Sequence, residues 1–438
     1  MKREKSLYCL LREKILNKKV TVGVIGLGYV GLPISIEFAK KGFNTIGFDI
    51  DKHKIKKLMR DRRSYIMDVC SQDIAYLVNK NVFRATTDFA LLRKVDVCII
   101  CVPTPWSKTK QPDISKIIEA THTLLKYIHT PLLVILESTT YPGTTEEILV
   151  QSFLKRKLIV GEEIFVCFSP ERIDPGNKEF KFSNIPKVIS GKTKKCLNLG
   201  KLLYSQVVEK VYTVSSLATA EMVKLLENSF RFINIGFINE FAMLCKKMNI
   251  DVWEVIRASS TKPFGYMPFY PGPGIGGECI PADPLYLAWK AKISGFEPRM
   301  IDLASQINFY MPTYIIDRIF EVLNNFKKSI KGSKILICGI TYKKDVSDTR
   351  ESPALEIMEK LFYLGAKISY IDPYVKSIKI KDKILISKGV NTNFSKYDLV
   401  VICTEHSIFD YEKIRKEAPL IFDARGVYKN SYENIVKL

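Results

Sequence analysis

The 438-residue sequence contains no long apolar run. Its longest mainly apolar segments, such as residues 95–102, which include Asp96, and 132–136, have the length of a strand, whereas a membrane helix requires about 18 apolar residues. Residues 1–20 mix lysine and arginine with leucine and isoleucine and lack the uninterrupted apolar core of a secretory signal. We therefore expect no membrane span and no secretory signal, and we expect these residues to form a short basic amphipathic helix.

The ten cysteines form no CxxC pair. Several of them, including Cys98, Cys101, Cys338 and Cys403, stand inside apparent strands, where a free thiol behaves as a small buried hydrophobe. Proteins that keep their thiols free usually reside in a reducing compartment. The cysteine pattern therefore predicts a cytoplasmic protein, and no metal site is expected.

The formal net charge is +21, but no nucleic-acid-binding motif accompanies it. A basic surface attracts phosphate polymers when its charges gather on one face, and here the lysines are spread along the whole chain. Nucleic-acid binding is therefore not the preferred explanation of the positive charge, and we expect no nucleic-acid partner. The other two explanations of the charge are a lysine-rich solvated surface and a cleft that attracts an anionic substrate.

The length predicts two or three domains, and the pattern of the first half is that of an α/β fold. Residues 19–26 form a β-branched run typical of a strand buried on both faces. A predicted helix follows and ends at Gly42, and residues 45–49 return as a second strand. Further strands are expected at 96–102, 132–137 and 165–169, with helical patterns between them. This alternation predicts a doubly wound domain.

A long helical pattern without proline covers residues 216–248 and predicts a rod of roughly 45 Å that offers a dimer face. After the Pro/Gly-rich loop 263–277 and a further helical region, strand and helix alternation resumes at residue 334. The predicted fold is α/β, with two Rossmann-like doubly wound domains joined by a long central helix. The predicted regions are a basic helix (1–19), a first Rossmann-like domain (20–215), a central helical region (216–325) and a closing Rossmann-like domain (326–438).

The sequence GLGYVG at residues 26–31 follows a strand and opens a helix. Gly26 permits the tight turn, Gly28 lets backbone amides approach a pyrophosphate, and Gly31 lets helix and strand pack closely. Asp49, at the end of the next strand, is placed to hold a ribose diol and to repel a 2′-phosphate. The context favours a dinucleotide site over incidental glycines and NAD over NADP, although Lys54 weakens the argument against NADP.

Cys279 follows two glycines and one glutamate at the end of the Pro/Gly loop, and Asp283 stands four residues later. Accessible backbone of this kind suits a nucleophile, and the carboxylate can accept a proton from a thiol or a water. On spacing alone, the functional and incidental interpretations of this cysteine stand equal. Lys224 and Asn228 share a helix face and can cradle an oxyanion, but by periodicity alone a solvated polar stripe is the better interpretation.

Two polar segments, 137–143 and 169–172, follow predicted strands. Open α/β sheets bind their ligands at the carboxyl ends of their strands, so position alone makes these segments candidates for a binding site.

Six motifs in order identify a family resemblance. They are GLGYVGLP (26–33), VPTP (102–105), SPER (169–172), KLLEN (224–228), GGEC (276–279), and KKD with DTR (343–345 and 348–350). From about residue 20 to its end the chain resembles the UDP-glucose and GDP-mannose dehydrogenase family of nucleotide-sugar dehydrogenases.

The resemblance implies a four-electron oxidation of a sugar C6 hydroxymethyl to a carboxylate, with two NAD consumed in turn. Cys279 matches the nucleophile that forms a thiohemiacetal and then a thioester. Lys224 and Asn228 match the pair that stabilises the oxyanion, and Asp283 matches the carboxylate near the catalytic water. Thr139 and Glu171 match further polar groups of the active site. For Lys224 and Asn228, the resemblance replaces the interpretation as a solvated polar stripe with a catalytic one.

The resemblance also implies two sets of binding residues and a homodimer. The implied NAD contacts are Gly26, Leu27, Gly28, Tyr29, Val30, Gly31, Asp49, Lys54, Thr104, Pro105, Ser138, Thr139 and Arg350. The implied UDP-sugar contacts are Glu171, Arg172, Lys224, Asn228, Tyr270, Gly274, Gly276, Tyr342, Lys343 and Arg425, of which the last three lie in a region that resembles the family's UDP-binding domain.

Residues 169–176 and 264–274 look most like the branch that acts on UDP-N-acetyl-hexosamines. UDP-glucose dehydrogenases usually carry Phe-Leu after the shared Glu171 and a second glutamate where this chain has Pro175. One departure is Glu278, where relatives in this branch usually have histidine. A carboxylate beside Cys279 would raise the thiol pKa by repulsion unless Lys224 or another cation offsets it, which affects the expected pH optimum.

The expected function is therefore that of a UDP-N-acetylglucosamine 6-dehydrogenase that supplies a uronate for polysaccharide or glycan synthesis. UDP-glucose and UDP-N-acetylmannosamine are the alternative substrates. A catalytically idle NAD- and nucleotide-sugar-binding protein is the alternative of a different class, and the presence of Cys279, Lys224, Asn228 and Asp283 argues against it.

Overall fold

The computed structural model describes residues 6–66, 68–106, 111–174, 176–177 and 179–438. Residues 1–5 of the expected N-terminal helix and Pro175 lie outside these ranges. The chain divides into two compact units, the first made of Met1–Glu227 with Leu285–Gly295 and the second of Asn228–Pro284 with Phe296–Leu438. The boundaries fall inside helices α8 (Leu217–Lys247) and α10 (Cys279–Ile293).

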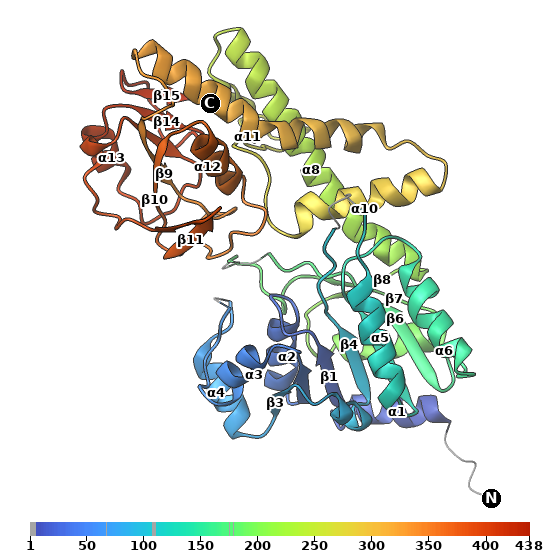
Figure 1. Cartoon of the computed structure of the whole chain (residues 1–438). Helices are drawn as coiled ribbons and strands as arrows, with labels where there is room; N and C mark the ends of the chain where they lie inside the picture. Colours follow the sequence, from blue (N-terminus) through green and yellow to red (C-terminus); the bar gives the residue numbers. More distant parts are fainter. Residues whose placement is uncertain (1–5, 67, 107–110, 175, 178) are drawn as a thin grey trace, which may run out of the picture. The chain divides into compact units, whose positions relative to one another are not determined.

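The first unit is built on a sheet of order β3-β2-β1-β4-β5-β6-β7-β8 (Figure 1). The strands from β3 to β6 are parallel, β7 pairs antiparallel with β6, and β8 runs parallel to β7. Their bounds are β1 Thr21–Ile25, β2 Asn44–Phe48, β3 Phe83–Thr86, β4 Val97–Ile100, β5 Leu132–Leu136, β6 Ile164–Phe168, β7 Lys187–Gly191 and β8 Val211–Thr213.

Helices cover both faces of this sheet, because its central strands are apolar and buried at nearly every position. One face packs Val22, Ile99 and Leu133 against α1, α2 and α7, and the other packs Cys98, Val134 and neighbours against α5, η2 and α6. The helices are α1 Leu7–Leu16, α2 Gly31–Lys40, α3 Lys52–Met59, α4 Ser71–Asn79, η1 Phe89–Lys94, α5 Ser115–Tyr127, η2 Thr145–Val150, α6 Gln151–Lys155 and α7 Lys194–Tyr204.

The second unit combines long helices with a smaller parallel sheet of order β10-β9-β13-β14-β15. Ile335 and Ile337 face α11 and α12, whereas Leu336 and Cys338 face the side of α13. The elements are α9 Val252–Ser259, α11 Arg299–Asn325, β9 Lys334–Cys338, α12 Pro353–Tyr363, β10 Lys367–Ile371, β11 Ser377–Ile380, β12 Lys383–Ile386, η3 Phe394–Lys396, β13 Leu399–Ile402, α13 Tyr411–Glu417, β14 Ile421–Asp423 and β15 Ile435–Lys437.

The predicted fold class is confirmed: each unit carries a doubly wound α/β sheet, and the helix expected at residues 216–248 is α8. The expected first helix is present as α1, where the Ser6 hydroxyl accepts a hydrogen bond from the Cys9 amide. Strands β3, β7, β8 and β15 and the hairpin of β11 and β12 were not predicted from the sequence. Within the part of the chain that the structure describes, no helix is both long and apolar enough to cross a membrane.

Candidate functional site

The polar residues of the first unit gather along one edge of its sheet. Since β1, β2, β4, β5 and β6 are parallel, their carboxyl ends share this edge. The glycine loop follows β1, Asp49 follows β2, Thr104 and Pro105 follow β4, Ser138 and Thr139 follow β5, and Glu171 and Arg172 follow β6. This is the edge at which open α/β sheets bind ligands.

The glycines of the loop between β1 and α2 are required by backbone packing at two positions. Gly26 has φ +93°, and a Cβ there would lie 2.5 Å from the carbonyl oxygen of Cys101. A Cβ on Gly31 would lie 1.8 Å from the carbonyl oxygen of Gly26. A Cβ on Gly28 would meet nothing within 4 Å, so the loop is open there, as a backbone that must approach a pyrophosphate requires. The loop, which includes Leu27, Tyr29 and Val30, therefore fits a dinucleotide.

Asp49 lies beside this loop. Its Oδ2 accepts a hydrogen bond from the Leu27 amide at 2.9 Å and pairs with the Lys54 ammonium at 3.0 Å, while its Oδ1 accepts from the Asp51 amide at 2.9 Å. Three contacts thus fix the carboxylate at the end of β2, where the ribose of a bound dinucleotide lies in this fold. NAD, when bound, supplies the hydride acceptor.

The loops after β4 and β5 are tied together. The Thr104 hydroxyl donates to the Thr139 carbonyl and the Ser138 hydroxyl to the Val102 carbonyl, each at 2.8 Å. The Tyr286 hydroxyl donates to the Pro105 carbonyl at 2.7 Å. These bonds hold the predicted Thr104, Pro105, Ser138 and Thr139 in a fixed arrangement.

Glu171 connects β6 to helix α8. The Lys224 ammonium donates to the Glu171 carbonyl oxygen at 2.7 Å, and the Glu171 carboxylate accepts from the amides of Arg172 and Ile173 at 2.7 and 2.6 Å. Arg172 pairs with Glu227 at 2.6 Å. Glu171 and Lys224, which stand 53 residues apart in the sequence, are therefore directly linked.

Behind Glu171 lies a group that the sequence analysis missed. Lys187, the first residue of β7, contacts Glu137 at 2.6 Å and Glu171 at 3.0 Å, and the Tyr204 hydroxyl donates to Glu137. Burial raises the pKa of Glu137 above its ordinary value. Burial alone would raise the pKa of Glu171 as well, but Lys187, a hydrogen bond with Glu137 and the Ile173 amide together lower it. Glu137 therefore binds its proton more tightly than an ordinary glutamate does, and Glu171 binds its proton less tightly.

In the second unit, the predicted nucleophile lies at the first residue of α10. Of the ten free cysteines, Cys279 is one of three that are exposed, and a helix N-terminus favours the thiolate form of a cysteine. Within the first turn of the same helix, the Asp283 carboxylate accepts a hydrogen bond from the Asn228 amide at 2.5 Å. The structure therefore brings Asn228 and Asp283 together, and Asp283 stands four residues after the exposed Cys279.

The loop before Cys279 packs on the loop that follows β9. The Gly277 amide donates to the Arg350 carbonyl at 2.9 Å, and the Arg350 guanidinium pairs with Glu278 and, at 2.6 Å, with Asp348. Arg350, expected to reach the cofactor, thus belongs to the second unit and contacts the carboxylate beside the nucleophile. The cation that pairs with Glu278 is therefore Arg350.

Among the predicted substrate residues of the second unit, Tyr342 and Lys343 follow β9 and Arg425 follows β14, so these three lie at the carboxyl ends of its parallel strands. A Cβ on Gly276 would lie 2.6 Å from the Tyr342 Cβ, so glycine is needed for this close approach. The Thr341 hydroxyl donates to the Lys343 carbonyl at 2.9 Å. Tyr270 is exposed and Gly274 has φ +134° in the Pro/Gly loop.

Arg425 follows β14 and is held by Glu405 through two contacts of 2.6 and 3.0 Å. Burial alone would raise the pKa of Glu405, but the Arg425 guanidinium lowers it. The pair keeps the guanidinium oriented, as the recognition of a phosphate or carboxylate group requires.

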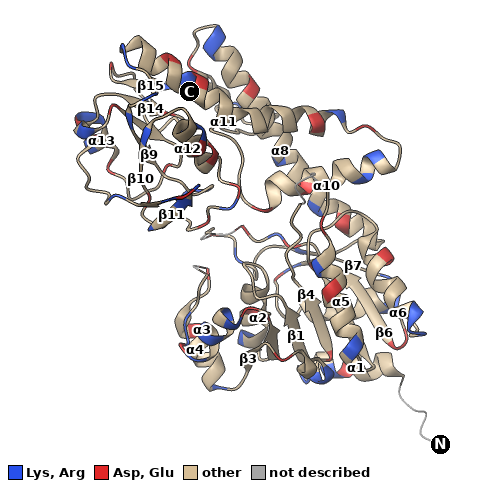
Figure 2. Ribbon diagram, viewed as in Figure 1, with Lys and Arg blue, Asp and Glu red and all other residues tan. Residues whose placement is uncertain are grey.

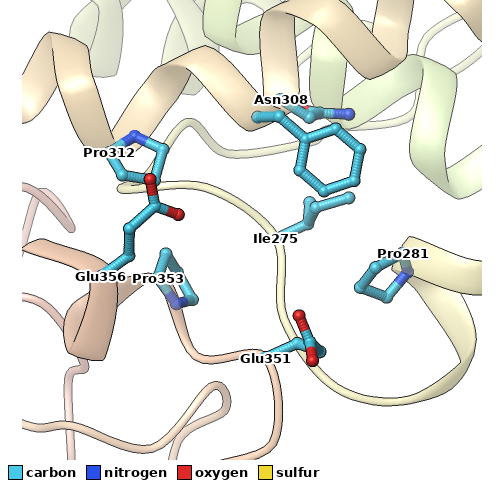
Figure 3. Close-up of a pocket in the computed structure, with 8 residues that line it drawn as sticks. Ile275, Pro281, Asn308, Pro312, Glu351, Pro353 and Glu356 are labelled. Atoms are coloured by element: carbon cyan, nitrogen blue, oxygen red, sulfur yellow. The ribbon is translucent and has the colours of Figure 1, made fainter. Parts of the chain in front are cut away.

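A cavity in the second unit lies beside this cluster and is shown in Figure 3. It is lined by Ile275 of the Pro/Gly loop, Pro281 of α10, Asn308, Phe309 and Pro312 of α11, and Glu351, Pro353 and Glu356. Two carboxylates and no cation line it, so we do not regard it as a diphosphate site.

The basic residues do not gather on one element. Figure 2 shows lysine and arginine on helices and loops of each unit, with aspartate and glutamate among them. Among the described residues, no cluster of three or more His, Cys, Asp or Glu side chains is placed to hold a metal ion.

The fold and the glycine loop define a dinucleotide-binding protein with a second α/β unit. Comparison with known proteins makes the class specific. Residues 20–208 match the NAD-binding domain of the UDP-glucose/GDP-mannose dehydrogenase family, residues 218–310 match its central domain, and residues 336–430 match its UDP-binding domain.

Individual relatives agree over nearly the whole length. The chain is 35% identical to the UDP-N-acetyl-D-glucosamine 6-dehydrogenase of Pseudomonas aeruginosa, over 91% of this chain and 94% of the relative. It is 32% identical to an NDP-N-acetyl-D-galactosaminuronic acid dehydrogenase of Ralstonia nicotianae, over 93% and 96%. The solved structure of the UDP-D-ManNAc dehydrogenase of Pyrococcus horikoshii is similar with a TM-score of 0.87 and 31% identity, covering 95% and 98%.

The chain belongs to the UDP-glucose/GDP-mannose dehydrogenase family. It is therefore an NAD-dependent nucleotide-sugar dehydrogenase. The expected family and the expected cofactor, NAD, are both confirmed.

Proposed function

We propose that the chain oxidises the C6 hydroxymethyl of a UDP-N-acetyl-hexosamine to the carboxylate, with UDP-N-acetylglucosamine as the first candidate. The observation that carries this proposal is the exposed Cys279 at the N-terminus of α10, four residues before an Asp283 that is bonded to Asn228. A simple alcohol dehydrogenase has no use for a cysteine nucleophile, whereas oxidation to the acid is made easier by a covalent intermediate that holds the aldehyde.

The proposed reaction has four steps. The C6 alcohol loses a hydride and a proton to give the aldehyde, and the Cys279 sulfur adds to its carbon to form a thiohemiacetal. Loss of a second hydride and a proton gives a thioester. Water then adds to the thioester, the C–S bond breaks, the Cys279 thiol is regenerated, and the product leaves as the carboxylate. Two NAD and one water are consumed, and two NADH and three protons are formed.

Individual side chains are assigned to these steps. The Lys224 ammonium, held by the Glu171 carbonyl oxygen at 2.7 Å, and the Asn228 amide stabilise the oxyanion. Asp283 accepts a proton from the attacking water. Thr139 and Glu171 orient the sugar. Arg425, Tyr342 and Lys343 bind the UDP portion, for which the matched UDP-binding domain supplies the support.

The choice of hexosamine rests on the 169–176 and 264–274 motifs and on the relatives' activities. The Pseudomonas relative acts on UDP-N-acetyl-D-glucosamine, but the Pyrococcus structure is that of a UDP-D-ManNAc enzyme at similar identity. UDP-N-acetylmannosamine is therefore the second candidate substrate. We also propose that the enzyme is homodimeric, since exposed apolar side chains such as Phe237 and Leu244 on α8 suit an interface between two copies. A cytoplasmic location is proposed from its free cysteines.

A substrate panel tests the proposal. Purified protein with NAD is supplied in turn with UDP-glucose and with the UDP-N-acetyl derivatives of glucosamine, galactosamine and mannosamine. We expect NADH with UDP-N-acetylglucosamine at two NADH per sugar, and no NADH with UDP-glucose. No NADH with any of the four sugars would contradict the proposed reaction.

The matched variant is Cys279→Ser, with Cys70→Ser, another exposed cysteine, as control. We expect Cys279→Ser to bind NAD and the UDP-sugar but to lose steady-state production of the uronate by at least 100-fold, as loss of the nucleophile requires. Full activity in Cys279→Ser would remove this cysteine from the mechanism.

A further inference from the structure

Four side chains of the first unit form a buried ionisable group, which we call the Lys187 cluster: Glu137, Glu171, Lys187 and Tyr204. They come from the end of β5, the end of β6, the start of β7 and the end of α7. Because β7 runs antiparallel to β6, its first residue lies at the same sheet edge as the residues that follow β6. Topology thus brings Lys187 to the edge that carries the site.

The cluster is sealed from water. Glu137 is 1% exposed, Lys187 4% and Tyr204 0%. The Lys187 ammonium contacts both carboxylates, and the rings of Phe182 and Tyr204 lie 5.1 and 5.3 Å from it. Buried charges cost several kcal/mol each unless every one is paired. Removal of one member therefore disturbs the others.

The cluster reaches the proposed active site through a single residue. Glu171 gives one carboxylate oxygen to Lys187 and the other to the amides of Arg172 and Ile173. Its own carbonyl oxygen accepts the Lys224 hydrogen bond. The side chain and the backbone of one residue thus connect the buried lysine with the lysine assigned to the oxyanion.

We propose that Lys187, held in place by Glu137 and Tyr204, is a positioning residue that fixes Glu171 and, through the Glu171 carbonyl, the Lys224 ammonium. This inference rests on the proposed function, because it assigns Lys224 to the oxyanion. A preorganised donor needs a supporting layer that removes its freedom to rotate. The charged or titratable groups that face Lys187 are Glu137 of β5, Glu171 after β6 and Tyr204 of α7, and Cys101 after β4 faces both carboxyl groups.

Two variants test the role directly. Lys187→Met keeps a side chain of similar length and removes the charge. Tyr204→Phe removes only the hydroxyl that donates a hydrogen bond to Glu137. We expect kcat to fall at least tenfold in Lys187→Met and about threefold in Tyr204→Phe. We expect the Kd for NAD, measured by fluorescence titration, to stay within twofold of the wild-type value, because the hydrogen bonds that orient Asp49 run to Leu27, Asp51 and Lys54, which do not belong to the cluster.

A double-mutant cycle separates positioning from a general structural effect. If Lys187 acts partly through Lys224, then its replacement costs less once Lys224 is already methionine. We therefore expect the single-turnover rate constant for NADH formation to fall less in Lys187→Met/Lys224→Met than the product of the two single losses. The same cycle with Tyr204→Phe gives the answer if Lys187→Met does not fold.

The control is Asp96→Asn. Asp96 is a buried carboxylate of the same sheet that also pairs with a lysine, Lys14, at 2.8 Å, but it stands at the amino end of β4 on the opposite edge. We expect its kcat to be unchanged. A wild-type kcat in both cluster variants, or losses that add in full to the loss of Lys224→Met, would overturn the inference while the proposed function stands. An inactive wild-type enzyme would overturn both.

Discussion

Glu278 places a negative charge next to Cys279, and Arg350 determines how much of that charge the thiol experiences. The Arg350 guanidinium is shared between Glu278 and Asp348. Both members of the Glu278–Arg350 pair are partly exposed, so water and salt screen it, and such pairs contribute at most about 1 kcal/mol. The pair therefore matters more to the charge around the thiol than to the stability of the unit.

Replacement of this carboxylate tests that view. In Glu278→Gln we expect iodoacetamide to alkylate Cys279 about two- to fivefold faster at pH 7. Removal of one screened negative charge lowers the free energy of ionisation of the thiol by about 0.4–1 kcal/mol, which raises the thiolate population by that factor. Peptide mass spectrometry distinguishes Cys279 from the exposed Cys9 and Cys70. Glu412→Gln is the control, since Glu412 pairs with Arg415 at 2.8 Å elsewhere in the unit. An unchanged rate would mean that Arg350 already neutralises Glu278.

Single residues also show what the sequence could predict of the site. The glycine loop, Asp49 and Cys279 each stand in a motif whose members are neighbours in the sequence, so a pattern reveals them. Lys187 stands 50 residues from Glu137 and 16 from Glu171, in a strand that no strong pattern predicted. Its partners become apparent only when the antiparallel pairing of β7 with β6 is known.

At the scale of elements, the predictions succeeded where a strand is buried on both faces. Strands β1, β4, β5 and β6 consist almost wholly of buried apolar residues, and such runs are recognisable. The hairpin of β11 and β12 is different, because Lys379, Lys383 and Ile384 are exposed and its two strands have four residues each. A short strand with mixed exposure leaves no periodic signal.

The turn from β1 to α2 gives a prediction at this scale. Gly31→Ala places a methyl group 1.8 Å from the Gly26 carbonyl oxygen, whereas Gly28→Ala places it in open space. We expect Gly31→Ala to lower the free energy of unfolding by about 1–3 kcal/mol and Gly28→Ala to lower it by less than about 0.5 kcal/mol. Urea denaturation followed by the fluorescence of the first unit measures both.

The affinity for NAD distinguishes Gly28→Ala, which has the smaller expected effect on stability. Because a methyl group on Gly28 occupies the path of the pyrophosphate, we expect Gly28→Ala to raise the Kd for NAD about tenfold or more, a loss of about 1.4 kcal/mol. Gly389→Ala is the control, since a Cβ there also meets nothing within 4 Å and lies in the second unit. Wild-type NAD affinity in Gly28→Ala would show that the pyrophosphate does not pass this residue.

At the scale of the whole molecule, stability must be considered unit by unit. Two compact units need not unfold in one transition, so a single melting temperature has no simple meaning. Hydrogen exchange of the β5 and β6 amides, followed by mass spectrometry, reports the unfolding of the first unit alone. The Lys187 cluster lies against these strands and gives the unit a specific dependence on pH.

The sign of that dependence follows from Glu137. Burial raises the pKa of Glu137 to about 8, from an ordinary value of 4.5, so the folded unit holds this proton more tightly than the unfolded chain does. The resulting stabilisation is complete below about pH 4.5 and is lost as the pH rises to about 8, with a slope of at most about 1.4 kcal/mol per pH unit. The lowered pKa of Glu171 acts only below 4.5 and the raised pKa of Lys187 only above 10.5.

Exchange at pH 5 and pH 8, corrected for the intrinsic rates, should therefore show less protection of β5 and β6 at pH 8. In Glu137→Gln the loss should shrink, because the amide binds no proton in either state. It should not vanish, since burial also raises the pKa of Glu221, whose carboxylate accepts from the Gly143 and Thr145 amides at 2.6 and 2.8 Å. Equal pH dependence in Glu137→Gln and the wild type would show that Glu137 is ionised throughout this range, with Lys187 compensating both carboxylates.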